Sequence, residues 1–480
     1  MFHSSRPVKA DREKCRCRSR HAWYTTPLLT AAILLGAGAE AQGQDSHYWA
    51  TQYGNRSRLL AGAVIGSVDD VSAVFYNPGA LALIETAELL LSGNVFEYTS
   101  VNYTGLVGGA EEFDSNRFKS LPSMVAGEFP FKFLGENRLA YSFLIRQDFD
   151  FRIRERNVFT GEELGLPGLA QLAGDVRIDQ DLTESWGGLT WARTVGPVSV
   201  GVTQFIANRS QRTEFQIAAQ ASDVAGDALL AIQNRDFRYN AWRILWKAGV
   251  SKILGPWQLG LSLTSPSVSL GGSGDIGFDS TFVISGVGSP GGLVTTTQEK
   301  LPARYKSPLS IGVGGAFTFN RDRARAHVAA EWFNRVDEYG VIDSEPFLAP
   351  QSGDTISFDI TQELESVFNA GVGIENQFSE LLGAYAGFRT DFNAGLEEPS
   401  EDGQFAANVS RWDLYHVALG STFTIERSDF TLGTVFSFGQ SEPFDPLDFL
   451  PGIRPPDEHR LAEAGLFRIT VILGFGLAGL

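Results

Sequence analysis

Hydrophobic residues recur at every second position in many short segments of this chain. The last segment is the clearest, because Phe467, Ile469, Val471, Leu473 and Phe475 alternate with residues that are mostly small or polar. A period of two predicts β-strands with one apolar face. The same alternation occurs in the ranges 139–145, 198–202, 257–263, 311–319, 415–425 and 430–438. The longer segments run for about nine to eleven residues, the length that a tilted strand needs to cross a bilayer.

The second face of these predicted strands is small rather than charged. Gly, Ala, Ser and Thr fill many alternate positions, as at Gly312, Gly314 and Thr318. A soluble β-sandwich also alternates, but its second face meets water and is usually rich in Lys, Glu and Thr. A face of small residues suits a barrel lumen packed against an internal plug. We therefore favour an all-β fold, a closed antiparallel transmembrane β-barrel, over a soluble sandwich or a secreted β-protein.

The connections between the predicted strands differ in length, as they do in outer-membrane barrels. Tight links at Thr194–Pro197, Gly255–Pro256, Asn320–Arg325 and Glu426–Asp429 would be periplasmic turns. The long connections would be extracellular loops, at about 158–185, 208–238, 265–306, 336–364, 393–410 and 439–465. Two of these loops contain stretches that we predict to be helical, Glu162–Ala173 and Ser222–Asn234, because their apolar residues gather on one side.

The first 41 residues have the pattern of a signal peptide. A basic region extends from Arg6 to Arg20, and an uncharged, mainly apolar core follows from Pro27 to Ala39. Ala39 and Ala41 are the small residues that a signal peptidase needs, so we expect cleavage before Gln42. The alternative, a membrane-anchoring helix, is disfavoured because the apolar core is too short to span a bilayer.

Removal of residues 1–41 changes the charge and the cysteine content. Both cysteines, Cys15 and Cys17, lie in this segment, so the mature chain would have no disulfide. The segment also holds seven of the 39 basic and three of the 56 acidic residues, which leaves a formal charge of −21. Such an excess of negative charge argues against a nucleic-acid partner. After Gln42 no uncharged apolar run reaches eighteen residues, which excludes transmembrane helices as the membrane anchor.

The stretch Ala61–Leu83, AGAVIGSVDDVSAVFYNPGALAL, resembles the start of the FadL/TodX (OMPP1) family of outer-membrane transport proteins for hydrophobic compounds. Within it, the residues that fit the family motif are Ser72, Ala73, Phe75, Tyr76, Asn77 and Pro78. Gly79-Ala80 inverts the usual Ala-Gly order but leaves a turn of small residues. Only these 25 or so residues are specific, and the rest of the chain offers compatible spacings.

The resemblance implies a barrel of about fourteen strands with its N-terminal segment folded inside as a hatch. We accordingly divide the chain into a signal peptide (1–41), a hatch (42–85) and a barrel (86–480) in the bacterial outer membrane. The hatch motif would comprise Ser72, Phe75, Tyr76, Asn77 and Pro78. A turn at Asn77-Pro78 is also expected from the residues themselves, because Asn bends the backbone and Pro fixes its φ angle. The bland alternative is an ordinary helix-to-strand junction.

The function implied by the resemblance is passive transport of long-chain fatty acids or other hydrophobic small molecules. Arg152, Arg154 and Arg156 share one strand face beside the aromatic residues around Phe149, and could contact a carboxylate head group if they face inward. The alternative role is charge balance within the lumen. The apolar loop residues would form a landing site for the ligand, or would simply pack on the rim: Leu164, Leu166, Leu169, Leu229, Leu230 and Ile232.

Other chemistry is weakly represented. The four histidines after residue 41 are scattered without metal-ligand spacing, so we expect no metal, no cofactor and no enzyme activity. The acidic run from Glu397 to Asp402 could hold Ca²⁺ that bridges lipopolysaccharide phosphates, although such a run more commonly faces water. The expected partners are a hydrophobic ligand, outer-membrane lipids and lipopolysaccharide, and we expect a monomer. The main alternative function is a structural or secretion-associated barrel of the same fold with protein partners.

Overall fold

The computed structural model describes residues 46–84, 89–104, 112–129, 135–162, 169–223, 228–284, 292–348, 353, 355–395, 404–406, 412–425, 428–441 and 463–477. All of them belong to the compact unit Glu40–Leu480. The predicted signal peptide, Leu164, Leu166 and the acidic run Glu397–Asp402 lie outside the described residues.

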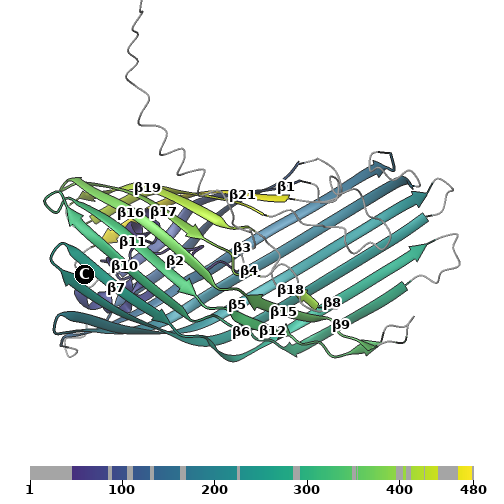
Figure 1. Cartoon of the computed structure of the whole chain (residues 1–480), viewed down its shortest axis with the longest axis horizontal. Coiled ribbons are helices and arrows are strands. Elements are labelled where there is room, and N and C mark those ends of the chain that lie inside the picture. Colours follow the sequence, from purple (N-terminus) through teal and green to yellow (C-terminus); the bar gives the residue numbers. More distant parts are fainter. Residues whose placement is uncertain are drawn as a thin grey trace, which may run out of the picture. The chain divides into compact units, whose positions relative to one another are not determined.

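Fourteen antiparallel strands form a closed barrel (Figure 1). The sheet runs from β5 through β4, β3, β2, β1, β21, β20, β19, β17, β16, β11, β10 and β7 to β6, and pairing between β5 and β6 closes it. The strands are β1 (Leu89–Thr104), β2 (Glu112–Glu128), β3 (Asn137–Thr160), β4 (Leu169–Val195), β5 (Val198–Asp223), β6 (Ala228–Leu254), β7 (Trp257–Thr264), β10 (Ser310–Phe319), β11 (Ala324–Phe333), β16 (Val367–Ser379), β17 (Leu382–Asp391), β19 (Leu414–Ile425), β20 (Ser428–Gln440) and β21 (Glu463–Leu477). The barrel, the strands predicted from alternation and the tight links at Thr194–Pro197, Gly255–Pro256 and Asn320–Arg325 are thereby confirmed. Residues 426 and 427 of the fourth link lie outside the described part of the chain.

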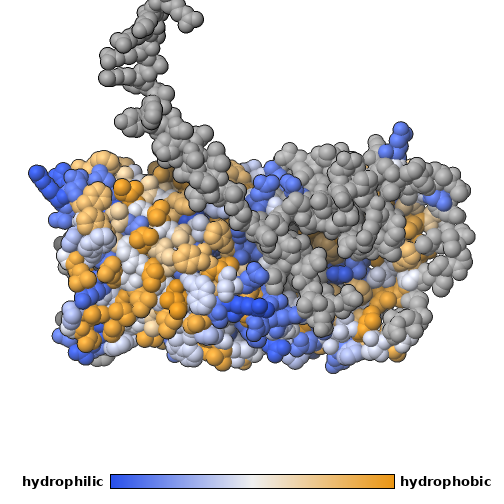
Figure 2. Space-filling model, viewed as in Figure 1, coloured by the Kyte–Doolittle hydropathy of each residue, from blue (hydrophilic) through white to orange (hydrophobic). Residues whose placement is uncertain are grey.

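The outer face of the barrel is apolar next to the tight links. On β6 the exposed side chains Trp242, Trp246 and Val250 point away from the lumen, whereas Arg243, Lys247 and the other alternate residues are buried. The orange surface in Figure 2 covers the region where Figure 1 places β7, β10, β11 and β16. This distribution is the one that lipid selects, because only one face of each strand would contact it.

Beyond the apolar band, β3–β6 continue as a tall wall together with β8 (Val268–Ile284) and β9 (Gly292–Pro302) (Figure 1). The loops predicted at 158–185, 208–238 and 265–306 are therefore wrong over most of their length, since these ranges are largely strand. The alternation in the wall has the opposite sense. On β5, Ser210 and Arg212 are exposed on the outer face, whereas Ile217 and Ala219 are buried on the inner face.

The helix predicted at Ser222–Asn234 is also wrong. β5 extends to Asp223 and β6 begins at Ala228, with only residues 224–227 outside the described part. Leu229–Ile232 pair with β5 on one side and with β8 on the other, so their backbone groups are satisfied in the sheet. In the other predicted helix, Glu162–Ala173, the residues from Leu169 onward begin β4.

The predicted loop at 336–364 forms small strands inside the wall. They are β12 (Val336–Ile342), β13 (Phe347–Leu348), β14 (Thr355–Ile356) and β15 (Asp359–Leu364), with β18 (Gln404–Ala406) parallel to β15. Val341, Ile342 and Ile360 pack in one buried cluster with Phe237 and Ile276 on the inner face of β6 and β8. This packing explains why the inner face of the wall is apolar.

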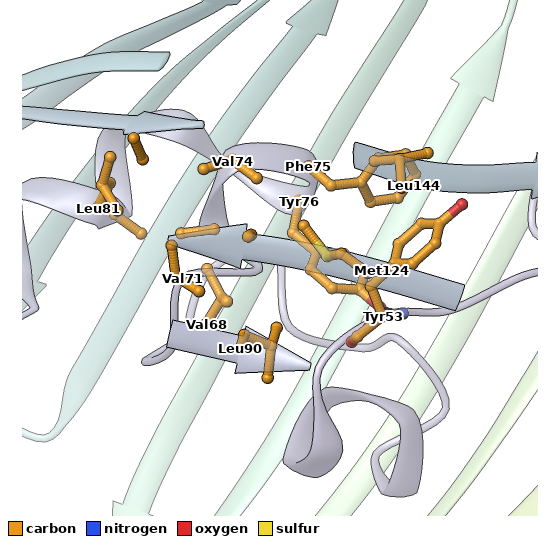
Figure 3. Close-up of a cluster of buried hydrophobic side chains, with 14 of the residues drawn as sticks. Tyr53, Val68, Val71, Val74, Phe75, Tyr76, Leu81, Leu90, Met124 and Leu144 are labelled. Atoms are coloured by element: carbon orange, nitrogen blue, oxygen red, sulfur yellow. Dashed lines mark hydrogen bonds between the residues drawn. The ribbon is translucent and has the colours of Figure 1, made fainter. Parts of the chain in front are cut away.

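The N-terminal residues Ser46–Ile84, here called the inner segment, lie against the lumen side of the barrel near the tight links. They contain the short helices α2 (Asn55–Leu59), α3 (Ala73–Tyr76) and η2 (Pro78–Leu83). None of the helices in the described part of the chain is long and apolar enough to cross a membrane. Figure 3 shows the cluster in which Tyr53, Phe75 and Tyr76 pack with Met124 of β2 and Leu144 of β3.

Candidate functional site

Asn77 of the predicted hatch motif ties the inner segment to the barrel. It ends α3, and its side-chain oxygen accepts a hydrogen bond from Gly79 N at 3.1 Å. Its amide nitrogen donates to the carbonyl oxygens of Ile65 (2.9 Å) and Val250 (3.0 Å) and to Ser251 Oγ (2.9 Å). The carboxamide therefore joins two parts of the inner segment to β6, and Asn77 is fully buried.

Glycines on the barrel strands let the inner segment approach the barrel backbone directly. A Cβ at Gly249 would lie 2.2 Å from Asn77 Oδ1 and 2.7 Å from Pro78 N, and one at Gly79 would lie 2.6 Å from Gly249 O. The inverted Gly79-Ala80 order thus places glycine where the contact is closest. Inner-segment atoms crowd the Cβ position in the same way at Gly201, Gly260, Gly312, Gly314, Gly373, Gly387, Gly420, Gly433 and Gly474.

Tyr76 and Phe75 organise the middle of the inner segment. Tyr76 Oη donates to Gln52 Oε1 at 2.9 Å and accepts from Tyr53 N at 2.9 Å. The Phe75 ring meets the Tyr53 ring edge-on at 4.6 Å between centroids. The remaining motif residue, Ser72, donates its backbone N–H to Asp70 Oδ1 at 2.8 Å and so closes the turn before α3.

Residues 47–52, here called the strap, cross the lumen and are held from several strands. Arg146 of β3 donates to Tyr48 O, and Arg389 of β17 donates to Ala50 O at 3.3 Å. Trp49 donates its backbone N–H to Asp391 Oδ1 at 2.8 Å and its indole N–H to Glu331 Oε2 at 2.9 Å. The strap contributes residues to two cavities, His47 and Tyr48 to the first and Ala50–Gln52 to the second.

The first cavity combines aromatic walls with basic side chains. Its empty volume is about 630 Å³, part of which is open to solvent. The aromatic lining consists of Tyr48, Phe75, Trp186, Tyr305 and Phe333, and the charged lining of Arg146, Arg243, Lys247, Lys306, Glu184 and Glu331. Four basic groups face two carboxylates, so the cavity carries a net positive charge. Such a site suits a ligand with an apolar body and an acidic head group.

Arg243 and Lys247 are paired with carboxylates, whereas Arg146 and Lys306 form no ion pair with a described residue. Glu184 forms ion pairs with Arg243 at 2.5 Å and with Arg209 at 3.2 Å, and Lys247 lies 3.7 Å from Glu331. Among the described residues no carboxylate lies within ion-pair distance of Arg146, whose Nη1 is buried without a hydrogen-bond partner. Its guanidinium lies 5.4 Å from the centre of the Phe75 ring. Arg146 therefore offers a buried N–H donor to a ligand carboxylate in this cavity.

The head-group contacts predicted for Arg152, Arg154 and Arg156 require these residues to face the lumen, and they do not. A register shift between Ile145 and Gln147 changes which positions of β3 face inward. Arg146 continues the buried parity of Ser142 and Leu144, whereas the three later arginines follow the shift and are exposed. Arg152 forms a cross-strand ion pair with Asp179 at 3.1 Å. The alternation within 152–156 was interpreted correctly, but sequence alone does not reveal the bulge that reverses the face.

The predicted landing-site residues do not form one loop surface. Leu229, Leu230 and Ile232 belong to β6 and are half-buried, and Leu169 belongs to β4. Leu229 packs against Leu172 and the alanines of the inner wall, whereas Leu230 and Ile232 have the opposite parity. On the inner face of the wall, Val176, Ile178 and Ile217 instead form a buried apolar cluster.

Sequence reasoning missed the charged lumen residues Glu184, Arg243, Lys247 and Glu331. Each lies on the inward parity of its strand, where most other residues are apolar or small, and Arg243 and Lys247 share the inward parity of β6. A charged residue on the small face of a predicted barrel strand was the available signal. No group of His, Cys, Asp and Glu in the described ranges could hold a metal ion.

The second cavity lies on the other side of the strap, with an empty volume of about 690 Å³ that includes open solvent. Its lining is mostly polar and includes Arg58, Arg389, Arg468, Glu97 and Asp148. Ser123 of β2 and Ile145 of β3 also line it. The cavity therefore adjoins the boundary between these two strands.

The pairing between β2 and β3 is short. Only Met124–Glu128 of β2 pair with Ala140–Leu144 of β3, although β2 pairs with β1 along most of its length and β3 pairs with β4 up to Thr160. Above Met124 and Leu144 the described parts of the two strands separate. The described pairing between β2 and β3 thus ends beside the second cavity, and this interruption of the pairing is here called the gap.

No family model matches the sequence, and no curated protein matches it. Solved structures do match. A FadL homologue from Pseudomonas aeruginosa is 13% identical with a TM-score of 0.54, and the match covers 90% of this chain and 99% of that chain. The toluene transporter TodX from Pseudomonas putida is also 13% identical with a TM-score of 0.54, over 88% of this chain and 98% of that chain. A deltaS2 mutant of the TodX monoaromatic hydrocarbon channel is 13% identical with a TM-score of 0.57, and the match covers 89% of this chain and 99% of that chain.

At 13% identity this likeness concerns the fold, and it extends along nearly the whole length of both chains. The resemblance first indicated by Ala61–Leu83 is therefore confirmed as a structural one. The chain has the FadL/TodX-like fold, a closed barrel of fourteen antiparallel strands with its N-terminal segment against the lumen.

Proposed function

We propose that this protein resides in the bacterial outer membrane and passively transports hydrophobic small molecules that carry an acidic head group, such as long-chain fatty acids. The observation that carries the proposal is the first cavity, where aromatic side chains surround Arg146 and its unpartnered Nη1. The solved structures of the same fold include a toluene transporter and a monoaromatic hydrocarbon channel, which supports transport of hydrophobic ligands.

The apolar inner face of the wall supplies a route to the cavity. An apolar molecule would pass along the cluster of Phe149, Val176, Ile178 and Ile217 before it reaches Tyr48 and Arg146. No energy source is needed for this movement, because the concentration gradient drives it. The inner segment acts as a hatch in this proposal, since its backbone lies directly against glycines of the barrel strands near the tight links.

The ligand then leaves either through a shift of the hatch or through the gap between β2 and β3. The short β2–β3 pairing favours the gap. Nine strands bear glycines whose Cβ positions are crowded by inner-segment atoms, which leaves little room for a ligand around that side of the hatch. The side chains of Met124 and Leu144 instead border the hatch at the gap.

Uptake of a radiolabelled fatty acid by a deletion strain, compared with its parent and with the complemented strain, tests transport. We expect uptake to fall in the deletion strain and to recover on complementation. If the deletion strain took up fatty acids and hydrocarbons as fast as its parent, the result would contradict the proposal.

Variants on β3 test the cavity. Arg146→Gln removes the charge beside Phe75, and Arg154→Gln removes an exposed charge on the same strand. We expect oleate affinity, measured by calorimetry on detergent-purified protein, to fall about tenfold for Arg146→Gln, since a charge-assisted hydrogen bond is lost. Arg154→Gln should bind oleate as the wild type does. Equal loss in both variants would contradict a head-group site at Arg146.

A further inference from the structure

Three arginines from different parts of the fold meet at the second cavity. Arg58 comes from α2 of the inner segment, Arg389 from β17 and Arg468 from β21. Arg58 is 5% exposed, Arg389 is 3% exposed, and the side chain of Arg468 is 13% exposed. The chain thus removes three cations from water and gathers them around one polar space, an arrangement that is unfavourable unless negative charge compensates it.

The carboxylates at this cavity compensate only part of that charge. Glu97 lies 3.5 Å from Arg468 Nε, and Asp148 is the only other acidic residue among the described residues that line the space. The lining residues by themselves therefore carry one net positive charge, and the buried carboxylate of Asp391, outside the lining, also acts on Arg389. Burial lowers the pKa of Arg58 to about 10, and the nearby charge of Arg389 acts in the same direction despite Glu97. The three cations are close enough for mutual repulsion.

Arg389 also has an unused donor. Its Nη2 donates to Ala50 O at 3.3 Å, which fixes the guanidinium against the strap. Its Nε is buried and has no hydrogen-bond partner. A buried donor without a partner carries a desolvation penalty, and an oxygen atom in the cavity would remove it. Ser437, Thr470 and Gln52 provide further polar groups around the same space.

We infer that the second cavity is a binding site for an oxyanion, the carboxylate or phosphate group of a free ion or of an amphiphile. Arg389 would donate from Nε, and Arg58 and Arg468 would complete the positive lining. The cavity adjoins the gap between β2 and β3 through Ser123 and Ile145, so an acyl chain attached to the oxyanion has a path out of the lumen. The site depends on the geometry of this cavity and not on transport.

Selenate and decanoate, used as separate probes on the detergent-purified full chain, test the inference. Selenate is a tetrahedral oxyanion whose anomalous scattering locates it in a crystal, and decanoate presents a carboxylate on a short acyl chain. We expect the bound oxyanion among Arg58, Arg389 and Arg468. Binding of both probes indicates that the oxyanion suffices, and binding of decanoate alone indicates that the site takes the head group of an amphiphile.

Affinities of the two probes should fall about tenfold in Arg389→Gln and in Arg468→Gln, and less in Arg389→Lys, which keeps the charge. Arg468→Gln is included because it keeps the Arg389 bond to Ala50 O that holds the strap. The matched control Arg154→Gln, on the exposed outer face, should leave both affinities unchanged.

Three outcomes overturn the inference. They are anomalous density only in the first cavity, unchanged affinity in both Arg389→Gln and Arg468→Gln, and failure of both probes to bind the wild type. Because the measurement needs no transport, a protein that fails in uptake assays but binds selenate here would still have this site.

Discussion

At the scale of single residues, contact between backbones holds the inner segment in place. Asn77 makes its hydrogen bonds to Val250 O and Ser251 Oγ only because Gly249 and Gly260 lack side chains where the two backbones meet. A methyl group at Gly249 has no free volume, since its nearest neighbours include the backbone nitrogens of Pro78 and Gly79. Backbone atoms cannot rotate away as a flexible side chain would.

Gly249→Ala should therefore loosen the inner segment. We expect the free energy of unfolding to drop by about 1–3 kcal/mol, as for an overpacked core, and ion leakage through the barrel to rise in planar bilayers. Gly187→Ala on β4 is the matched control, because a Cβ there has nothing within 4 Å. A variant at Gly249 that unfolds and conducts like the Gly187 variant would show that the close approach is not required.

Asp70 gives the inner segment a dependence on pH. Burial, with the neighbouring charge of Asp69, raises the pKa of Asp70 to about 6, although hydrogen bonds from Ser72 act in the opposite direction. An acid whose folded-state pKa is raised stabilises the fold in its protonated form. That stabilisation is present below the unfolded pKa of 3.8 and is lost as the pH rises through about 6.

The difference in melting temperature between the wild type and Asp70→Asn isolates this effect, because other titrating groups are common to both proteins. We expect the wild type to lose stability relative to the variant between about pH 4 and pH 6 and the difference to stay constant above that range. A difference that does not vary with pH would refute the assignment.

The residues that could be predicted were those with a local signal. The motif Ser72–Pro78 could be predicted because its residues, including the Asn77-Pro78 turn, are consecutive in the sequence. Lys247 and Glu331 were not found, since their meeting at 3.7 Å depends on the barrel that brings β6 and β11 together. The face occupied by Arg152 depended on one bulge, and a bulge leaves no signature in the alternation that follows it.

At the scale of elements, α2 is attached to the barrel strands by an ion pair as well as by packing. Arg56 donates from Nε to Glu375 Oε2 at 2.6 Å and from Nη2 to Oε1 at 2.8 Å, a bidentate pair between α2 and β16. Both side chains are 14% exposed, so solvent screens the pair only in part. Leu59 and Leu60 of the same helix region pack against glycines of the barrel strands, which fixes the distance between α2 and these strands.

Removal of one partner should be more harmful than removal of both. We expect Arg56→Met or Glu375→Met to reduce the free energy of unfolding by about 2 kcal/mol, because each removes the bidentate partner of a largely buried charge. Arg56 would keep only Asp69 at 3.1 Å, and Glu375 would keep Arg325 and His327 at 3.5 Å. The double variant should regain part of that loss. Urea unfolding in a double-mutant cycle measures the coupling, and strictly additive losses would contradict a direct interaction.

Strands in the wall show why element boundaries were harder to predict than elements. The alternation of β5 and β6 continues past the apolar band, but its outer residues become polar at Ser210 and Arg238. A prediction that requires one apolar outer face therefore ends the strand at this change. Pairing in fact continues from Ser222–Ala228 down to Ser199–Ser251, because backbone hydrogen bonds do not depend on which face is apolar.

At the scale of the whole molecule, the apolar band has the height of a bilayer. On β6 the outward residues run from Trp242 to Leu254, about 40 Å along the strand, which corresponds to about 30 Å across a membrane at the tilt usual for barrels. Trp242 near the upper limit and Trp257 beside the tight link mark its two edges, where aromatic residues are usual.

Charge placed inside this band should be far more costly than charge placed on the wall. Ala248→Arg lies on the outer face within the band and should reduce the free energy of folding into lipid vesicles by about 2–4 kcal/mol. Ser210→Arg, on the outer face of the wall, should change it by less than about 1 kcal/mol. Equal effects at the two positions would contradict a membrane at this level.

The short pairing of β2 with β3 makes the thickness of the host bilayer a variable in its own right. A strand edge that lacks a neighbour presents amide groups that hydrocarbon cannot solvate, at several kcal/mol for each group. Lipids with longer acyl tails would draw more of that edge into hydrocarbon and push the two strands toward each other. Reconstituted vesicles of graded tail length should consequently take up ligand at graded rates, fastest where the bilayer is thin.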